Sequence, residues 1–161
     1  MNEKPAAAVL TLSDQGAAGL REDTSGPAIR ERLADLGIAV NSHAIQSDDP
    51  DTIEAQLREW VAAGLDLIVT TGGTGFGPRD NTPEATRRVI ERDAPGLAEL
   101  IRAEGLRKTP MAALSRGICG IAGRTLIVNL PGSERAVREN MDALAPVLPH
   151  ALQLIAGDTE H

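Results

Sequence analysis

The chain has 161 residues and a formal net charge of −7, with one Trp, one Phe and no Tyr. This length predicts a single domain, residues 1–161, with a core built from Leu, Ile, Val and Ala. The few aromatic side chains and the negative charge argue against nucleic-acid binding, which depends on base stacking and on cations along the phosphate backbone.

Cys119 is the one cysteine, which excludes an internal disulfide and a cysteine metal cluster. It lies in an apolar run, and this favours a core position over a reactive thiol. The first residues lack a charged-then-apolar signal pattern, and no apolar run approaches membrane-spanning length. We therefore expect a cytoplasmic protein without membrane contact.

Strands and helices are expected to alternate through the first half of the chain. The expected elements are a strand at 6–12, an exposed loop to residue 23, a helix at 25–37, a strand at 38–45, a helix at 51–64 and a strand at 67–71. Asp51 and Glu54, three residues apart, resemble a capping box at the start of the second helix.

The glycine-rich loop, residues 72–81, carries Gly72, Gly73, Gly75 and Gly77 directly after the apolar strand. Glycine permits positive φ and a close approach of the backbone to a ligand. Residues 82–84, Thr-Pro-Glu, then predict a helix with Thr82 as its N-cap. Such a loop between a strand and a helix can bind phosphate, although glycine-rich turns also occur for steric reasons alone. The spacing matches neither a P-loop nor a dinucleotide fingerprint.

The second half predicts further helices and a strand pair. The expected elements are helices at 82–93 and 95–106, a connector at 111–117, strands at 118–122 and 125–130, and a helical segment from Ser133 that Pro146 and Pro149 divide. The short turn between the last two strands indicates that one of them is antiparallel to the rest. The fold class is therefore α/β, with an open, mostly parallel sheet in three layers, helices on both faces and one antiparallel strand.

Ligands of open α/β sheets bind beyond the carboxyl ends of the strands. Four loops are expected there, at residues 13–16, 46–50, 72–81 and 129–133. In this crevice Asp48 and Asp80 could jointly hold a divalent cation that is shared with phosphate groups. Structural roles stay open as alternatives: an ordinary turn for Ser13-Asp14, a solvated acidic turn for Asp48-Asp49, an exposed connector for Ser115-Arg116, and local backbone bonding for Asn129.

Residues 71–84, Thr-Gly-Gly-Thr-Gly-Phe-Gly-Pro-Arg-Asp-Asn-Thr-Pro-Glu, closely resemble the signature of the molybdopterin-binding family, which includes MogA and MoaB proteins and the G domain of gephyrin. Further matching motifs run through the chain: Ser13-Asp14, Asp23, Ser25-Gly26-Pro27, Asp48-Asp49, Pro95-Gly96 with Glu99, Leu114-Ser115-Arg116, and Asn129-Leu130-Pro131-Gly132-Ser133.

The resemblance implies molybdopterin adenylyltransferase activity in molybdenum cofactor biosynthesis. In this reaction the terminal phosphate of molybdopterin attacks the α-phosphate of ATP, with Mg²⁺, and pyrophosphate is released. The family's essential acids correspond to Asp48 and Asp80, as catalytic residues and metal ligands. The substrate-binding residues that it implies are Ser13, Asp14, Gly72, Gly73, Thr74, Gly75, Arg79, Ser115, Asn129, Pro131, Gly132 and Ser133.

Alternatives remain within the family. The chain is short, like MoaB-type members, and a non-catalytic carrier of molybdopterin is the second hypothesis. Glu134 stands where the family often has Pro, which places an acid beside the last binding loop. A homo-oligomer is implied, most often a trimer and in MoaB-type members a hexamer, together with contact to the metal-insertion protein of the pathway.

Overall fold

The computed structural model describes residues 3–158. Its elements are β1 (Ala6–Leu12), α1 (Asp14–Ala17), α2 (Ser25–Asp35), β2 (Ala39–Gln46), α3 (Pro50–Ala62), β3 (Leu67–Thr71), α4 (Thr82–Val89), β4 (Arg92–Asp93), α5 (Pro95–Leu106), the 3₁₀ helix η1 (Pro110–Leu114), β5 (Cys119–Ala122), β6 (Thr125–Leu130), α6 (Glu134–Leu144) and α7 (Leu148–Ile155).

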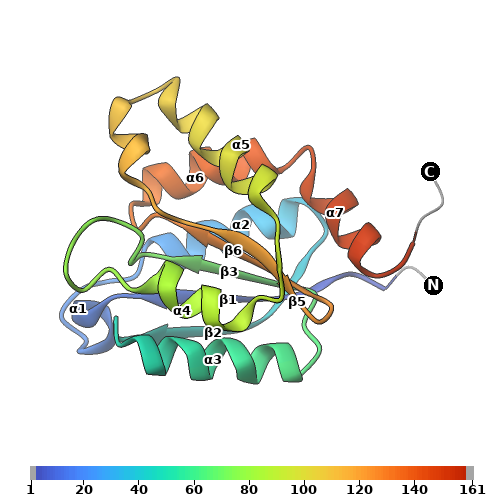
Figure 1. Cartoon of the computed structure of the whole chain (residues 1–161), viewed down its shortest axis with the longest axis horizontal. Coiled ribbons are helices and arrows are strands. Elements are labelled where there is room, and N and C mark those ends of the chain that lie inside the picture. The colour runs from blue at the N-terminus through green and yellow to red at the C-terminus, as the bar shows by residue number, and fades with distance from the viewer. Residues whose placement is uncertain (1–2, 159–161) are drawn as a thin grey trace.

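The strands form one six-stranded sheet in the order β2-β1-β3-β6-β5-β4 (Figure 1). β2, β1, β3 and β6 are parallel, and β5 runs antiparallel to both of its neighbours. All five residues of β3 are buried, because this strand lies in the middle of the sheet with helices on both sides. The predicted α/β class, the mostly parallel sheet and the one reversed strand are confirmed.

Helices cover both faces of the sheet. α2, α5, α6 and α7 lie on one face and α3 and α4 on the other (Figure 1). On the second face Ile53, Leu57 and Trp60 of α3 lie one helical turn apart and pack against Ile68 of β3. Burial of each such side chain contributes about 1.5–3 kcal/mol to folding, so apolar spacing accounts for the docking of this helix.

The start of α3 and the end of α4 differ from the sequence prediction for a clear physical reason. α3 does not begin with the Asp51–Glu54 capping box: Asp49 is the N-cap, and its carboxylate accepts hydrogen bonds from the backbone and hydroxyl of Thr52, both at 2.9 Å. α4 ends at Val89 rather than at residue 93, because residues 92–93 pair with β5 as the short strand β4.

Ser133 is confirmed as the N-cap of α6, since its hydroxyl accepts a hydrogen bond from the amide of Ala136 at 3.0 Å. The loop expected up to residue 23 contains the single turn α1. Cys119 is buried in the core, and burial raises the pKa of its thiol to about 12, so the thiolate is not formed near neutral pH.

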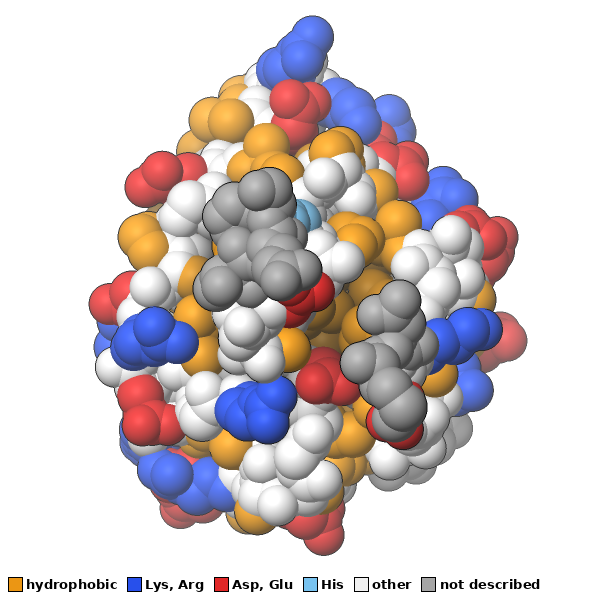
Figure 2. All heavy atoms as spheres, turned by 90° about the vertical axis from the view of Figure 1, so that its right-hand side faces the viewer, with side chains coloured by type: hydrophobic (Ala, Val, Ile, Leu, Met, Phe, Trp, Pro, Cys, Tyr) orange, Lys and Arg blue, Asp and Glu red, His pale blue; other side chains and the backbone are white. Residues whose placement is uncertain are grey.

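Figure 2 shows the end of the molecule at which the parallel strands begin. Acidic and basic side chains are interspersed on this face, so it carries no large field of a single sign. Among residues 3–158, no helix combines the length and the apolar character needed to cross a lipid bilayer.

Candidate active site

The candidate site lies at the carboxyl ends of the parallel strands, on the left of Figure 1. β2 and β3 flank β1 on opposite sides, so the strand order reverses between β1 and β3. Such a switch point is where open α/β sheets bind ligands. The four loops predicted to converge here do so, and residues from each of them line one cavity.

Gly72 and Gly73 begin the glycine-rich loop with φ of +99° and +68°. A Cβ atom at Gly72 would collide with the carbonyl oxygen of Leu12, and one at Gly73 would collide with the Thr82 hydroxyl. That hydroxyl is not an N-cap as predicted: it donates to the Gly72 carbonyl at 2.9 Å, and Asn81 is the N-cap of α4. Positive φ together with the close approach of a backbone carbonyl at Gly72 and of a side-chain hydroxyl at Gly73 therefore requires glycine at both positions.

Asp80 closes the glycine-rich loop on itself. Its Oδ2 accepts a hydrogen bond from the Gly77 amide at 2.8 Å, and its own amide donates to the Gly77 carbonyl at 3.0 Å. A Cβ atom at either Gly75 or Gly77 would lie 2.9 Å from this carboxylate oxygen. The loop thus folds around the Asp80 carboxylate and fixes its position.

Arg116 holds the same loop from outside. Its Nε donates to the carbonyl of Gly75 and its guanidinium to that of Asp80, both at 2.8 Å. The guanidinium also bonds Glu84 on α4 at 2.7 and 3.2 Å, and the backbone amide donates to Thr74 at 2.8 Å. This ion pair raises the pKa of Arg116 and lowers that of Glu84, so both stay charged.

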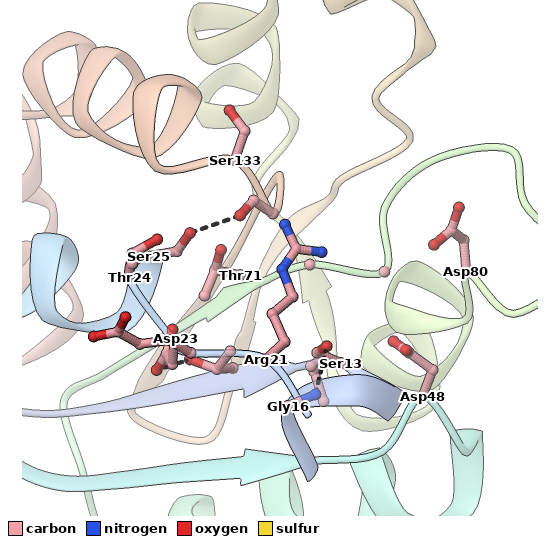
Figure 3. Close-up of a pocket in the computed structure, with 16 residues that line it drawn as sticks. Ser13, Gly16, Arg21, Asp23, Thr24, Ser25, Asp48, Thr71, Asp80 and Ser133 are labelled. Atoms are coloured by element: carbon pink, nitrogen blue, oxygen red, sulfur yellow. Dashed lines mark hydrogen bonds between the residues drawn. The ribbon is translucent and has the colours of Figure 1, made fainter. Parts of the chain in front are cut away.

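The loop after β6 is fastened to the neighbouring elements by hydroxyl groups. Thr71 donates to the Pro131 carbonyl at 2.7 Å. Ser25 donates to the Gly132 carbonyl at 2.6 Å (Figure 3). A Cβ atom at Gly132 would lie 3.4 Å from Cα of Gly72. The two glycine-containing loops therefore lie against each other through backbone.

Asp48 and Asp14 bond each other reciprocally through backbone amides, at 3.1 and 3.0 Å. Oδ1 of Asp48 is buried and has no hydrogen-bond partner within residues 3–158. Burial, followed by repulsion from Asp14 and Asp80, raises the pKa of Asp48. A buried carboxylate oxygen without a donor is unfavourable for the free protein and is suited to a cation.

Arg79 forms a two-point ion pair with Asp14, at 3.1 and 2.9 Å. This pairing lowers the pKa of Asp14. The guanidinium of Arg79 is therefore already paired with a carboxylate of the protein. Neither Arg79 nor Asp14 lines a cavity of the site.

Two cavities meet at the glycine-containing loops. The first cavity, about 410 Å³, lies between α1, the start of α2 and the two loops (Figure 3). The second cavity, about 510 Å³, lies between the same loops and α5, η1 and α6. Of the predicted site residues, Ser13 and Asp48 line the first cavity, Thr74, Gly75, Ser115 and Pro131 the second, and Gly72, Gly73, Asp80, Gly132 and Ser133 both.

The residues present fit a Mg²⁺ ion bound together with a phosphate ligand. Asp48 and Asp80 both line the first cavity, and Figure 3 shows their carboxylates on the same side of it. Within residues 3–158 no group of three or more potential ligand side chains is arranged as a metal site. Mg²⁺ at one or two carboxylates completes its shell with water and substrate oxygens, so a preformed cage is not needed.

Asn129 lies in the interior, away from both cavities. Its amide nitrogen donates to the hydroxyls of Thr70 and Thr86, each at 3.0 Å, and its oxygen accepts from the amide of Ile118 at 3.2 Å. The side chain thus joins β3, α4 and the start of β5. Asn129, which the sequence predicts to bind substrate, instead holds together the elements that carry the site.

Two arginines of the site region were not assigned by sequence. Arg116 belongs to a recognised motif, but its contacts are with residues about 30 to 40 positions away, which spacing does not reveal. Arg21 lines the first cavity from a polar stretch with neither helical nor strand periodicity. Its neighbour Asp23, which belongs to a matching motif, is bonded to Thr11 and His43.

Comparison with known proteins agrees with this geometry. The family described as "Probable molybdopterin binding domain" matches residues 8–150. A Helicobacter pylori protein named molybdopterin adenylyltransferase is 42% identical in an alignment of 153 residues that covers 93% of this chain and 87% of that protein. The Drosophila melanogaster molybdenum cofactor synthesis protein cinnamon is 47% identical over 93% of this chain, which spans only 25% of that protein.

Among solved structures, the molybdopterin biosynthesis enzyme MoaB from Thermus thermophilus superposes with a TM-score of 0.90 at 56% identity. The superposition covers 94% of this chain and 96% of that one. Match length, identity and fold agree with the motifs that surround the two cavities, and the chain belongs to the molybdopterin-binding MogA/MoaB family.

Proposed function

We propose that the protein is a molybdopterin adenylyltransferase of molybdenum cofactor biosynthesis. A phosphate oxygen of molybdopterin attacks the α-phosphorus of ATP. A new P–O bond forms, the bond between the α-phosphorus and the α,β-bridging oxygen breaks, and that oxygen leaves with pyrophosphate. The products are adenylylated molybdopterin and pyrophosphate. The whole of residues 1–161 would act as one domain in this reaction.

The observation that carries the proposal is the common wall of the two cavities. Gly72, Gly73 and Gly132 line both, and none of them has a side chain to separate the ligands. A transfer between two phosphate groups needs both held in line at one point. Two cavities that open onto the same backbone supply such a point.

The chain's own groups position the substrates and balance their charge. The backbone of the glycine-rich loop, held by Arg116 and by the Thr82 hydroxyl, forms a rigid surface against which phosphates can lie. Asp80 lines both cavities and is fixed by the Gly77 amide. Preorganised polar groups of this kind need not rearrange during the reaction.

Asp48 and Asp80 would hold Mg²⁺ with the polyphosphate of ATP in the first cavity. When bound, the ion neutralises negative charge on the phosphates. Oδ1 of Asp48, which has no partner within the described residues, is the oxygen best placed to gain from it. We therefore assign ATP to the first cavity and molybdopterin to the second.

Pyrophosphate release tests this function. Wild type and Asp80→Ala would be mixed with ATP and Mg²⁺, with and without molybdopterin. We expect release that requires molybdopterin and falls about 100-fold or more in the variant. Circular dichroism and melting check that the variant is folded. Equal rates in both proteins would contradict the metal-site assignment.

A non-catalytic molybdopterin carrier is the alternative. Tight molybdopterin binding without pyrophosphate release in the wild type would support it. The partnerless oxygen of Asp48 favours the enzyme, because binding of a pterin alone has no need of a buried unpaired carboxylate.

The assembly state is part of the proposal. Met111 and Leu114 of η1 are 63% and 46% exposed beside the second cavity, and exposed apolar groups of this kind are common at subunit contacts. A homotrimer or a hexamer, contact with the metal-insertion protein of the pathway, and a cytoplasmic location stay predictions. Light scattering at micromolar concentration would test the first: a monomer would contradict it.

A further inference from the structure

Arg21 is the basic side chain that reaches into the first cavity. It lies on the connection between α1 and α2 and is one of the residues that line the cavity. Figure 3 shows it extending from the side of β1 between Asp23 and Ser25 on one side and Asp48 and Asp80 on the other. Within residues 3–158 its guanidinium has no hydrogen bond and no ion pair.

The other arginines near the site are occupied. Arg79 is paired with Asp14, and Arg116 with Glu84. Arg102, which lines the second cavity, donates to backbone carbonyls at 2.8 and 3.3 Å. Of the basic side chains that the structure places on the two cavity walls, Arg21 alone is without a protein partner.

The first cavity otherwise carries negative charge. Glu22, Asp23, Asp48 and Asp80 line it, and among them Asp23 has His43 Nε2 at 3.0 Å from its carboxylate. An anionic ligand in such a cavity is repelled unless cations lie beside it. A metal ion at Asp48 and Asp80 would neutralise the ligand's negative charge on their side of the cavity. Arg21 is the positive charge that lies away from those two acids.

The direction of the AMP transfer indicates which part of the nucleotide lies beside the Arg21 guanidinium. The attacking and leaving oxygens lie on opposite sides of the α-phosphorus. If molybdopterin enters from the second cavity, the leaving pyrophosphate extends away from the shared glycines into the first cavity. This is the cavity that holds Arg21.

We propose that Arg21 binds the pyrophosphate portion of the nucleotide in the first cavity. A guanidinium offers paired N–H donors that match two phosphate oxygens, and such charge-assisted bonds are stronger than neutral ones. The role of Arg21 in turnover rests on the proposed function, whereas the existence of an anion site at Arg21 does not depend on it. Arg21 would bind inorganic pyrophosphate whether or not the protein transfers AMP.

The test is titration calorimetry with inorganic pyrophosphate and Mg²⁺ on wild type, Arg21→Gln, Arg21→Lys and Arg30→Gln. Arg30 is the matched control, because it is an exposed arginine of α2 that lines neither cavity of the site. We expect about tenfold weaker binding for Arg21→Gln, partial recovery in Arg21→Lys, and no change for Arg30→Gln. AMP, which lacks the pyrophosphate portion, should bind all four proteins alike.

Three outcomes would overturn the assignment: wild type without measurable pyrophosphate binding, Arg21→Gln with the wild-type affinity, or an equal loss in Arg30→Gln. Turnover separates this from the proposed function. Pyrophosphate binding that depends on Arg21, in a wild type that releases none from ATP and molybdopterin, would reject the enzyme and keep the anion site. Normal turnover together with unchanged pyrophosphate binding in Arg21→Gln would reject the anion site and keep the enzyme.

Discussion

The backbone amides of Asp14 and Asp48 each donate a hydrogen bond to the carboxylate of the other residue, at 3.1 and 3.0 Å. This reciprocal pair joins the loop after β1 to the loop after β2. It uses Oδ2 of Asp48 and leaves Oδ1 buried without a donor. The same contact therefore fixes the carboxylate and reserves one oxygen of it for a ligand.

Asp48→Asn should not weaken the free protein near neutral pH. Burial raises the pKa of Asp48, so its contribution to stability is present below its ordinary value of 3.8 and is lost as the pH rises through the folded-state pKa. The variant should therefore match or exceed the wild-type stability near neutral pH and lose any advantage in acid. Urea unfolding of both proteins near neutral pH and in acid measures this difference in stability. A clear destabilisation of the variant near neutral pH would contradict the prediction.

Mg²⁺ binding gives Asp48→Asn a second, opposite readout. We expect Mg²⁺ at ten times its Kd, together with an ATP analogue that cannot be cleaved, to stabilise the wild type by about 1.4 kcal/mol beyond the analogue alone. The variant should lose most of this gain, because the oxygen without a partner no longer belongs to a charged carboxylate. Equal Mg²⁺ effects in both proteins would exclude Asp48 as a ligand.

Arg116→Lys should impair the glycine-rich loop while keeping the charge. A lysine cannot bond Glu84 at two points and the carbonyls of Gly75 and Asp80 together, so we expect a loss of about 1–3 kcal/mol and a fall in kcat/KM. Arg107→Lys is the control, since Arg107 forms an exposed pair of little energetic weight. Urea unfolding and initial rates measure both, and similar behaviour of the two variants would refute a clamping role.

Gly72→Ala should destabilise the protein by about 3 kcal/mol or more, because positive φ is combined with a collision against the Leu12 carbonyl. Gly123→Ala is the matched comparison. Gly123 also has positive φ, at +58°, but has open space where a Cβ atom would lie, so about 1–2 kcal/mol is expected. Denaturant midpoints give both values, and equal losses would mean that φ alone sets the cost.

Asn129→Ala separates a supporting role from a substrate-binding one. The change leaves two threonine hydroxyls and the Ile118 amide without their partner, at a cost of about 1–3 kcal/mol. Asn41→Ala, at an exposed position of β2, should change stability by less than about 0.5 kcal/mol. The folded Asn129 variant should bind molybdopterin with unchanged affinity. A large loss of affinity in a fully folded variant would show that Asn129 contacts the ligand.

Local pattern was sufficient for most of the fold. The apolar run at Ala6–Leu12 and the capping residue Ser133 were located correctly, because a buried strand and an N-cap depend on residues close in sequence. Arg92–Asp93 was missed, since two charged residues carry no strand pattern and pair only because β5 lies beside them. Thr82 failed as an N-cap because its hydroxyl bonds Gly72, ten residues earlier.

The site was predictable as a set of loops but not as a set of contacts. The motif and the position after strands predict Asp48, Asp80, Gly72, Gly73 and Gly75 as site residues, and the structure places them on the walls of the two cavities. The pairing of Arg79 with Asp14, 65 residues away, followed from no spacing rule. Long-range partners decide which polar side chains remain available to a ligand, and these emerge only in three dimensions.

The close approach of Gly72 and Gly132 has an evolutionary consequence. Where the two cavities join, part of the boundary is the main chain of Gly72 and Gly132, which a substitution elsewhere does not reshape as long as these glycines persist. The side chains on either side belong to different helices and loops and can diverge independently. A descendant of this protein could thus acquire a new preference for one ligand while the other ligand and the geometry between them stay as they were.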